Sequence, residues 1–316
     1  MTTTDLTSML RRQLRPALLG TGNFGGIAGT VAPGVGLDAA RATTIMDHAV
    51  EVGITVFDTA DIYAQGASER IVGEWVRAHP DADVLIQTKA GNTATGPNLS
   101  PEHVVGRLQR SIDTLGRVDL FLSHRVDPDT PWKDSLPVFS RAVEDGTIRA
   151  YGVSNVTATD LTEVLHTADK LSLVRPALVQ NEYSWLTRRD DPELLPIVEA
   201  EGLLYTPYSP LANGLLAGRY SNGERPGHGD RASIASGTAH LLDDPRAQFR
   251  LRAFDDVAAQ YGLEPASLAL AWVMHQPQIA APIISVSRDE QWSAAWAANQ
   301  FVWTPEVDLA LNQIPE

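Results

Sequence analysis

Residues 54–89 read ITVFDTADIYAQGASERIVGEWVRAHPDADVLIQTK, and they contain one complete folding unit. The run TVF at 55–57 is typical of a short buried strand. An amphipathic stretch at 68–78 predicts a helix, and a second apolar run at 84–88 predicts another strand. A strand, a helix and a strand in this order indicate two parallel strands joined by a crossover helix.

The same alternation continues along the chain in both directions. We predict strands at 17–20, 55–57, 84–88, 119–122, 150–153, 177–179, 203–206 and 281–284, with helices at 37–52, 68–78, 101–115, 132–145, 158–168, 191–201 and 289–298. Eight strands at intervals of roughly 25–40 residues predict an α/β fold, a (β/α)₈ TIM barrel that fills residues 1–316 as a single domain. Two domains would also fit the length. A doubly wound open sheet is the alternative architecture, but no G-x-G-x-x-G follows the first strand.

Helix ends and one long interval refine this prediction. SPE at 100–102 and DPE at 191–193 each place a capping side chain before a proline, as at a helix start. Glycines at 53, 116, 146 and 202 lie where helix ends need a left-handed residue. The interval between strands 7 and 8 is much longer than the others. This long insert holds a Gly/Pro-rich loop at 221–237 and helical stretches at 246–261 and 265–275.

Composition excludes several classes of function. The chain has 316 residues, a net charge of −14 and no cysteine. The negative charge argues against nucleic acid or an anionic membrane as a partner. Without cysteine there is no disulfide, thiol nucleophile or thiolate metal site, and no histidine pair has the helical spacing of metal ligands. No signal peptide or membrane-spanning run is evident, so we expect a cytoplasmic protein.

Polar side chains follow nearly every predicted strand. They are Asp58, Lys89, His124, Ser154, Asn155, Gln180, Tyr208, Ser209 and Ser285, with Tyr63 one short loop beyond Asp58. Taken singly, each has a structural interpretation: a helix cap, a surface lysine, an exposed loop aromatic or a hydrogen-bonded buried histidine. In a barrel, however, the carboxyl ends of the strands meet at one mouth, where catalytic groups lie. Their joint occurrence therefore predicts an active site.

These segments resemble the aldo-keto reductase superfamily. The stretches that carry the resemblance are FDTADIYAQGASERIVGEW at 57–75, QTKAG at 87–91, VDLFLSHRVDPDTP at 118–131, EDGTIRAYGVSN at 144–155, QNEYS at 180–184 and YSPLANGLLAGRY at 208–220. Together they cover nearly the whole chain in the family's order. The resemblance implies a barrel that binds NADP(H) without a Rossmann motif and transfers a hydride to a carbonyl carbon.

The resemblance also implies a role for each catalytic residue. Tyr63 is the general acid, Asp58 and Lys89 tune it, and His124 orients the carbonyl. Tyrosine has a reference pKa of about 10, and a nearby ammonium favours the phenolate. A neutral histidine can donate a hydrogen bond to a carbonyl oxygen as negative charge develops there.

For the cofactor, the resemblance implies three groups of contacts. Ser154, Asn155 and Gln180 hold the nicotinamide carboxamide, which needs both a donor and an acceptor. Tyr208 stacks on the nicotinamide ring, although core packing is its structural alternative. The remaining expected contacts are Thr21, Gly22, Ser209, Leu211, Asn213, Arg219, Arg231, Ser285, Ser287, Arg288 and Gln291, of which the arginines suit phosphate. Solvated surface is the alternative for these arginines. We expect the loop at 221–237 to cover the cofactor.

The chain departs from the family pattern at two places. Ser285 stands where the family usually has glycine, and Ala294-Ala295 stand where it commonly has a Glu-Asn pair that meets adenine. These differences leave the choice of NADP(H) over NAD(H) open. Trp292 is expected to pack in the core, with stacking on adenine as its alternative.

Three functions fit the sequence to different degrees. The first is NADPH-dependent reduction of a small-molecule aldehyde or ketone, with Phe24, Asn92, Trp132 and Trp185 around the substrate. The second is an NADP(H)-binding regulatory or redox-sensing subunit, which the presence of His124 disfavours. The third is a lyase that uses Lys89 as a Schiff-base nucleophile, which Asp58 opposes by keeping Lys89 protonated. The sequence does not indicate an oligomeric state.

Overall fold

The computed structural model describes residues 3–27, 31–32, 35–227, 230–234 and 239–315. Within them, eight parallel strands form one sheet in the order β10-β1-β2-β3-β6-β7-β8-β9. The strands are β1 (Leu18–Gly20), β2 (Val56–Asp58), β3 (Leu85–Ala90), β6 (Leu120–Ser123), β7 (Ala150–Ser154), β8 (Leu178–Gln180), β9 (Leu204–Tyr205) and β10 (Ile283–Ile284). Tyr205 bridges Ile279, and the Ala280 amide donates to the Tyr205 carbonyl at 2.8 Å, so the two edges of the curled sheet meet. All eight predicted strands are present, each within two residues of its predicted bounds at either end.

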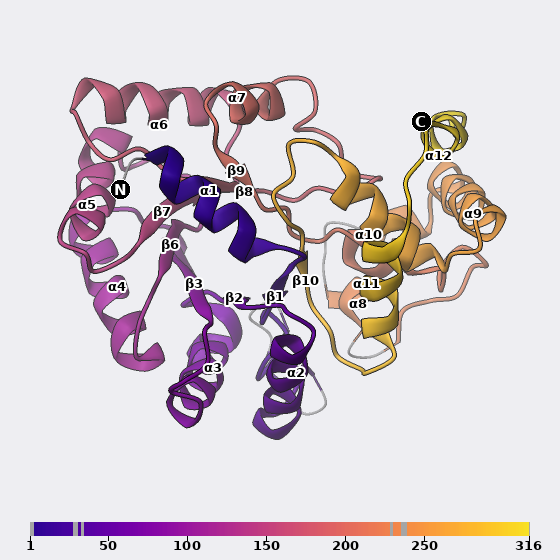
Figure 1. Cartoon of the computed structure of the whole chain (residues 1–316), viewed down its shortest axis with the longest axis horizontal. Coiled ribbons are helices and arrows are strands. Elements are labelled where there is room, and N and C mark those ends of the chain that lie inside the picture. Colours follow the sequence, from indigo (N-terminus) through magenta and orange to yellow (C-terminus); the bar gives the residue numbers. More distant parts are fainter. Residues whose placement is uncertain (1–2, 28–30, 33–34, 228–229, 235–238, 316) are drawn as a thin grey trace.

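Helices cover the outside of this sheet (Figure 1). They include α2 (Ala39–Glu51), α3 (Ala67–Ala78), α4 (Pro101–Leu115), α5 (Trp132–Glu144), α6 (Ala158–Lys170), α7 (Leu194–Ala200) and α11 (Gln291–Gln300). Their positions match the seven predicted helices, and the four predicted glycines have left-handed φ angles between 65° and 88°. Strand residues that face outward, such as Phe57, Ile86 and Phe121, pack against these helices in one large apolar cluster.

Two predicted side-chain caps are not formed, although α4 begins at Pro101 as predicted. Ser100 precedes α4, but its hydroxyl donates to the Asn98 side chain at 2.7 Å instead of capping the helix. The α7 helix begins at Leu194 and not at Asp191. The reason is that the Asp191 carboxylate accepts a bond from Arg188 at 2.8 Å, within a turn that precedes the helix.

The chain between β9 and β10 lies on one side of the sheet (Figure 1). It contains η2 (Ala212–Ala217), α8 (Arg231–Ile234), η3 (Ala239–Leu242), α9 (Pro245–Gln260) and α10 (Pro265–His275). The last two match the helical stretches predicted at 246–261 and 265–275. Part of the predicted loop at 221–237 lies outside the described residues, namely 228–229 and 235–238. The C-terminal helix α12 (Pro305–Asn312), which we did not predict, packs against α9.

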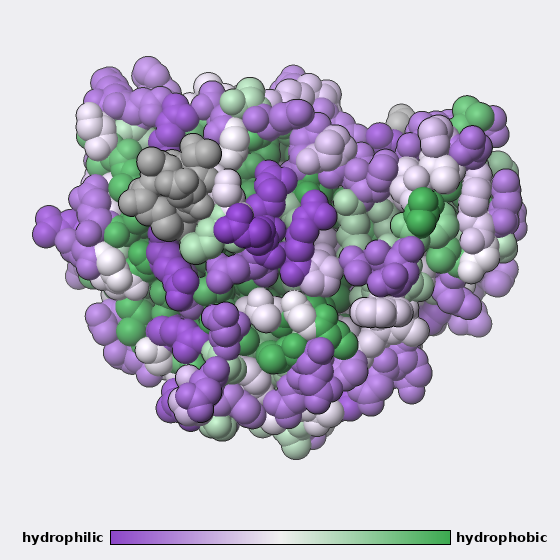
Figure 2. All heavy atoms as spheres, viewed as in Figure 1, coloured by the Kyte–Doolittle hydropathy of each residue, from purple (hydrophilic) through white to green (hydrophobic). Residues whose placement is uncertain are grey.

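A helix that the sequence analysis missed, α1 (Thr3–Leu14), crosses one end of the barrel (Figure 1). Its Leu10 and Leu14 have no solvent exposure, and they belong to a second apolar cluster that contains the first residue of all eight strands. The helix therefore closes the end at which the strands begin. Hydrophilic side chains cover much of the middle of this face (Figure 2). The polar residues predicted for the active site lie at the opposite end, where the strands finish.

Among the described helices, none has the length and apolar character needed to cross a bilayer.

We predict that Leu14→Ala destabilises the fold, because it removes apolar contacts that close the barrel interior. A fully buried leucine cut to alanine costs about 2–5 kcal/mol of unfolding free energy. Urea denaturation followed by circular dichroism measures this loss. The matched control is Leu309→Ala in α12, where the leucine is 60% exposed and the expected change is within about 0.5 kcal/mol. Equal stability of the two variants would show that α1 does not close the barrel.

Candidate active site

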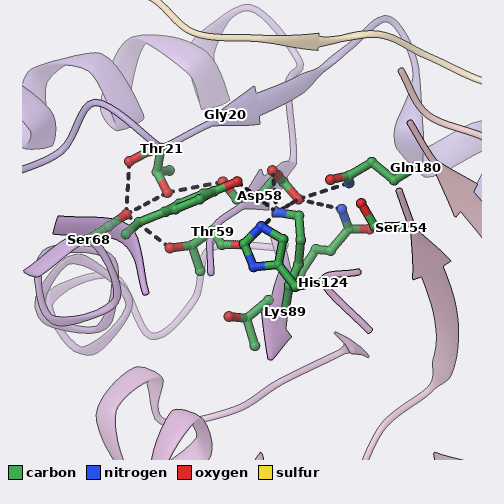
Figure 3. Close-up of polar contacts among 12 residues, drawn as sticks. Gly20, Thr21, Asp58, Thr59, Ser68, Lys89, His124, Ser154 and Gln180 are labelled. Carbon is green, nitrogen blue, oxygen red and sulfur yellow. Dashed lines mark hydrogen bonds and ion pairs between the residues drawn. The ribbon is translucent and has the colours of Figure 1, made fainter. Parts of the chain in front are cut away.

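A buried ion pair lies at the centre of the strand ends (Figure 3). The Lys89 Nζ donates to both carboxylate oxygens of Asp58, at 2.8 and 2.9 Å, and to the Thr59 carbonyl at 2.7 Å. Lys89 is 1% exposed and Asp58 is 3% exposed. Charged groups this deeply buried need partners, and each has the other.

The strand pattern explains why these two side chains meet. Asp58 ends β2 and is in register with Gln87 of β3. Because alternate residues of a strand share a face, Gln87 and Lys89 both point into the barrel. The Gln87 Nε2 donates to the Asp58 Oδ1 at 2.5 Å, and the Gln180 Nε2 reaches the same oxygen at 3.2 Å. We did not predict a role for Gln87, although a glutamine alternating with Lys89 in the apolar run VLIQTK was a usable signal.

Tyr63 lies directly above the ion pair. It begins η1 (Tyr63–Gly66), and its hydroxyl is 3.4 Å from the Lys89 Nζ, with its ring centroid 5.0 Å away. The loop before it is fastened at Asp61, whose amide donates to the Lys89 carbonyl at 3.0 Å. The Arg107 Nε of α4 donates to the Asp61 carboxylate at 2.6 Å. These contacts fix the loop that carries Tyr63.

The electrostatics of the pair keep Lys89 charged. Burial alone lowers the pKa of Lys89, but the Asp58 carboxylate and then the Tyr63 phenol more than offset this, and the net pKa lies above its ordinary value. Lys89 is therefore an ammonium at neutral pH, with its positive charge beside the Tyr63 hydroxyl.

His124 faces Tyr63 from the end of β6. The two rings meet edge to face, with centroids 5.7 Å apart and an interplanar angle of 81°. Burial, the Lys89 charge and the Arg125 charge together lower the pKa of His124 to about 3. The imidazole is therefore neutral near pH 7, and its buried Nδ1 has no hydrogen-bond partner among the described residues.

A hydroxyl network lies behind the ion pair. The Ser68 hydroxyl is 2.8 Å from the Thr21 hydroxyl and 2.9 Å from the Thr59 hydroxyl, and it donates to the Thr21 carbonyl at 2.9 Å. These bonds fasten α3 to the ends of β1 and β2 (Figure 3). Thr21 itself is fully buried, and its side chain points into this network. We expected Thr21 near the cofactor, but the cavity lining does not include it.

A cavity of about 750 Å³ opens above these residues. The predicted site residues that line it are Gly22, Asp58, Tyr63, His124, Ser154, Asn155, Gln180, Tyr208, Ser209, Leu211, Asn213, Arg219, Arg231, Ser285, Ser287, Arg288 and Gln291. Lys89 lies beneath the lining, in contact with Asp58 and Tyr63. Residues spread over more than 200 positions of the chain thus meet around one space, as the strand-end argument predicted.

Hydrogen bonds pre-position the residues expected to hold a carboxamide. Asn155 has a left-handed φ of 56°, and its amide nitrogen donates to the His124 carbonyl at 2.8 Å and to the Ser154 hydroxyl at 3.1 Å. The Tyr208 hydroxyl donates to the Asn155 Oδ1 at 2.6 Å. Asn181, which we did not single out, bonds both the amide and the carbonyl of the next residue, Val156, at 3.0 and 2.7 Å.

The arginines that we expected to contact phosphate differ in their partners within the protein. Arg219 forms an ion pair with Asp230 at 2.8 Å, and Arg231 is 3.4 Å from the Asn213 Oδ1. The Arg288 side chain has no partner among the described residues. The amides of Ser287 and Arg288 donate to the Gln291 Oε1 at 2.7 and 3.2 Å, so this side chain caps the turn before α11.

The departures from the family pattern also have structural counterparts. The Ser285 hydroxyl donates to the Gly20 carbonyl at 3.0 Å, at the seam between β10 and β1. Ala294 and Ala295 line the cavity, whereas Trp292 is buried, does not line it, and packs at 5.1 Å from the His48 ring. The structure thus agrees with the packing interpretation of Trp292.

Of the residues expected around a substrate, only Asn92 lines the cavity. Phe24, Trp132 and Trp185 are at most 4% exposed and pack in the apolar core. Trp185, for example, lies 4.8 Å from the Phe254 ring. Nearness in sequence to a strand end did not place these side chains at the mouth.

Within the described ranges, no group of three or more histidine or acidic side chains has a metal-binding arrangement.

Comparison with known proteins gives a consistent result. Residues 18–314 match the family model described as Aldo/keto reductase family. A putative voltage-gated potassium channel subunit beta of Schizosaccharomyces pombe is 31% identical, over 88% of this chain and 85% of the relative. The uncharacterized oxidoreductase YrpG of Bacillus subtilis is 31% identical over 90% of each chain. A probable aldo-keto reductase 1 of Glycine max is 29% identical, over 87% of this chain and 81% of the relative.

We predict that the His124 ring stays neutral from about pH 8 down to about pH 5, because its pKa of about 3 lies far below the usual 6.5. Carbon–proton NMR spectra of histidine-labelled protein measure this, with the resonance assigned by its loss in His124→Gln. The unfolded chain takes up this proton below about pH 6.5 and the folded chain does not, so protonation favours unfolding as the pH falls. A midpoint near pH 6.5 for this resonance would contradict the neutral assignment.

Proposed function

The chain belongs to the aldo/keto reductase family, and on this premise we propose that it reduces an aldehyde or ketone to an alcohol with NADPH. The observation that carries the proposal is the placement of Tyr63 in the cavity wall, with the buried Lys89–Asp58 pair beneath it and a neutral His124 beside it. Reduction of a carbonyl group to an alcohol needs a proton donor, a group that stabilises the donor's anion and a hydrogen-bond donor for the carbonyl oxygen.

Each residue then has a distinct task. Tyr63 donates its hydroxyl proton to the carbonyl oxygen as the alcohol forms. The Lys89 ammonium, 3.4 Å from that hydroxyl, stabilises the phenolate that remains, and Asp58 holds the ammonium in place and charged. The neutral His124 ring donates an N–H to the same carbonyl oxygen. When bound, the nicotinamide would supply the hydride to the carbonyl carbon.

The cavity fits a nicotinamide dinucleotide in size and in chemistry. Its volume of about 750 Å³ lies within the usual range of cofactor pockets, about 300–1,000 Å³. The Gln180 Oε1 has no partner among the described residues, so it can accept from a carboxamide while its Nε2 remains on Asp58. Tyr208 offers an aromatic face, and Gly22, Ser209, Leu211 and Asn213 also line the cavity.

Cationic side chains in the cavity lining suit phosphate. Arg231 and Arg288 line the cavity without a carboxylate partner among the described residues, and Arg219 lines it while paired with Asp230. A guanidinium suits a 2′-phosphate, which favours NADP(H) over NAD(H). Ser285, Ser287 and Gln291 also line the cavity. We propose further that the described part of the loop at 221–237, which belongs to the long interval between the seventh and eighth strands, covers the cofactor, and that residues 1–316 are one domain that acts in the cytosol.

An NADP(H)-binding regulatory or redox-sensing subunit is the second candidate. The observation in its favour is the similarity to relatives named as potassium channel beta subunits, one of them 31% identical over 88% of this chain. The two proposals share the cofactor and differ in turnover. A Schiff-base lyase is less well supported, because the raised pKa of Lys89 keeps it protonated and therefore not nucleophilic.

We predict that Tyr63→Phe lowers kcat for aldehyde reduction by about 10²–10⁴-fold, since it removes the proton donor. NADPH binding, followed by tryptophan fluorescence, should stay within about threefold of wild type, because the ring that borders the cavity remains. In the wild type, NADPH should bind more tightly than NADH. The control is Tyr261→Phe at the end of α9, outside the cavity lining.

Retained turnover in Tyr63→Phe would overturn the assignment of the proton donor. Tight NADPH binding without turnover of any carbonyl compound by the wild type would instead favour the regulatory subunit. Binding of neither cofactor would contradict both proposals.

A further inference from the structure

Some of the charged side chains that line the cavity form ion pairs, and others have no partner of opposite charge among the described residues. Both carboxylates in the lining, Asp58 and Asp230, form ion pairs, with Lys89 and Arg219. The cations without a carboxylate partner among the described residues are Arg125, Arg231 and Arg288. In a chain with a net charge of −14, three arginines without a carboxylate partner around one cavity are a local excess of positive charge. Arg231 and Arg288 lie with the residues assigned to cofactor phosphate, which leaves Arg125 unexplained.

Arg125 lies at the catalytic end of the cavity. It directly follows His124, and its charge is one of the causes that lower the pKa of that ring. The nearest carboxylate in sequence is Asp127, but its oxygens accept bonds from the Leu99 and Asp129 amides and the Thr130 hydroxyl, at 2.7 to 3.0 Å. Asp127 is therefore committed to its own loop and does not neutralise Arg125.

Asn92 is a second polar side chain of the cavity lining without a hydrogen-bond partner among the described residues. Strands β3 and β6 are neighbours in register at Ala90 and Ser123, and the His124 amide donates to the Ala90 carbonyl at 2.7 Å. Asn92 and Arg125 each follow this last paired position by two residues. Both line the cavity, and neither side chain has a hydrogen-bond partner among the described residues. A guanidinium and an amide N–H in the lining of one cavity are donors suited to the oxygens of a carboxylate or a phosphate.

We propose that Arg125 and Asn92 form a binding site for an anionic group of the substrate, which makes an aldehyde or ketone bearing a carboxylate or phosphate the preferred substrate class. This inference rests on the proposed carbonyl reduction. It adds that the protein also binds the substrate at an anionic group separate from its carbonyl. The anion binds at Arg125 while the carbonyl reaches Tyr63 and His124, so the two ends of the substrate fix its orientation.

Three para-substituted benzaldehydes test the site: 4-formylbenzoate, its neutral methyl ester, and 4-formylphenyl phosphate. We expect the wild type to show kcat/KM at least about tenfold higher for one of the anionic compounds than for the ester, as for a charge-assisted hydrogen bond. Comparing the two anions identifies which group the site prefers. Arg125→Met should reduce the ratio of anionic to neutral substrate to near one, and Asn92→Ala should reduce it by about threefold.

The control is Arg110→Met, which removes the same charge from an exposed position of α4 outside the cavity lining and should leave the ratio unchanged. An independent measurement uses the product analogue 4-(hydroxymethyl)benzoate and its methyl ester, whose binding to the protein with NADP⁺ is followed by calorimetry. The acid should bind at least about tenfold more tightly, and Arg125→Met should remove the difference.

Equal kcat/KM for the ester and both anions, or a preference that survives in Arg125→Met, would overturn the anion site while leaving carbonyl reduction intact. If none of the three aldehydes is reduced, the proposed reaction fails, and the binding comparison still decides the anion site: equal affinity of acid and ester would overturn it.

Discussion

The burial of a lysine ammonium against an aspartate, with almost no access to water, is the constraint on which the rest of this site depends. Such a pair is stable only if every donor and acceptor finds a partner. Asp58 accepts from Lys89, Gln87 and Gln180, whereas Lys89 uses Asp58, the Thr59 carbonyl and the Tyr63 hydroxyl. Asp58 and Tyr63 both line the cavity, and the Tyr63 ring lies edge to face with His124 there. The charge buried under the barrel mouth therefore acts on the cavity through the Tyr63 hydroxyl.

The two ends of the barrel carry different side chains, apolar at one end and polar at the other, and this difference makes the arrangement possible. At the end where the strands begin, α1 and the first residue of each strand form a buried apolar cluster. At the other end the strands deliver side chains of different chemistry to one space, and the loop bonds at Asp61 and Asn181 hold them there. A rigid floor of strand residues with hydrogen-bonded loops above it gives the precise placement that proton transfer requires.

Much of this could be predicted from the sequence, because strand alternation and polar strand ends are local signals. The eight strands and the meeting of Asp58, Tyr63, Lys89 and His124 followed from them. Other features depend on tertiary contacts that no local pattern encodes. Leu10 and Leu14 become buried only when the first residues of the eight strands pack against them. Trp132 and Trp185 are near strand ends in sequence but pack in the core. Thr21 and Gly22 are adjacent, yet only the glycine lines the cavity, because the threonine side chain is bonded to Ser68 on the other side of the chain, a tertiary contact that the sequence does not show.

The central claim is that a hydride and a proton are transferred to a carbonyl group in this cavity. The most direct measurement is reduction of an aromatic aldehyde with NADPH that carries deuterium at the transferred position, with mass spectrometry of the alcohol. The account predicts an alcohol with one deuterium on the former carbonyl carbon, formed by the wild type. Absence of the alcohol, or an alcohol without deuterium, would contradict it.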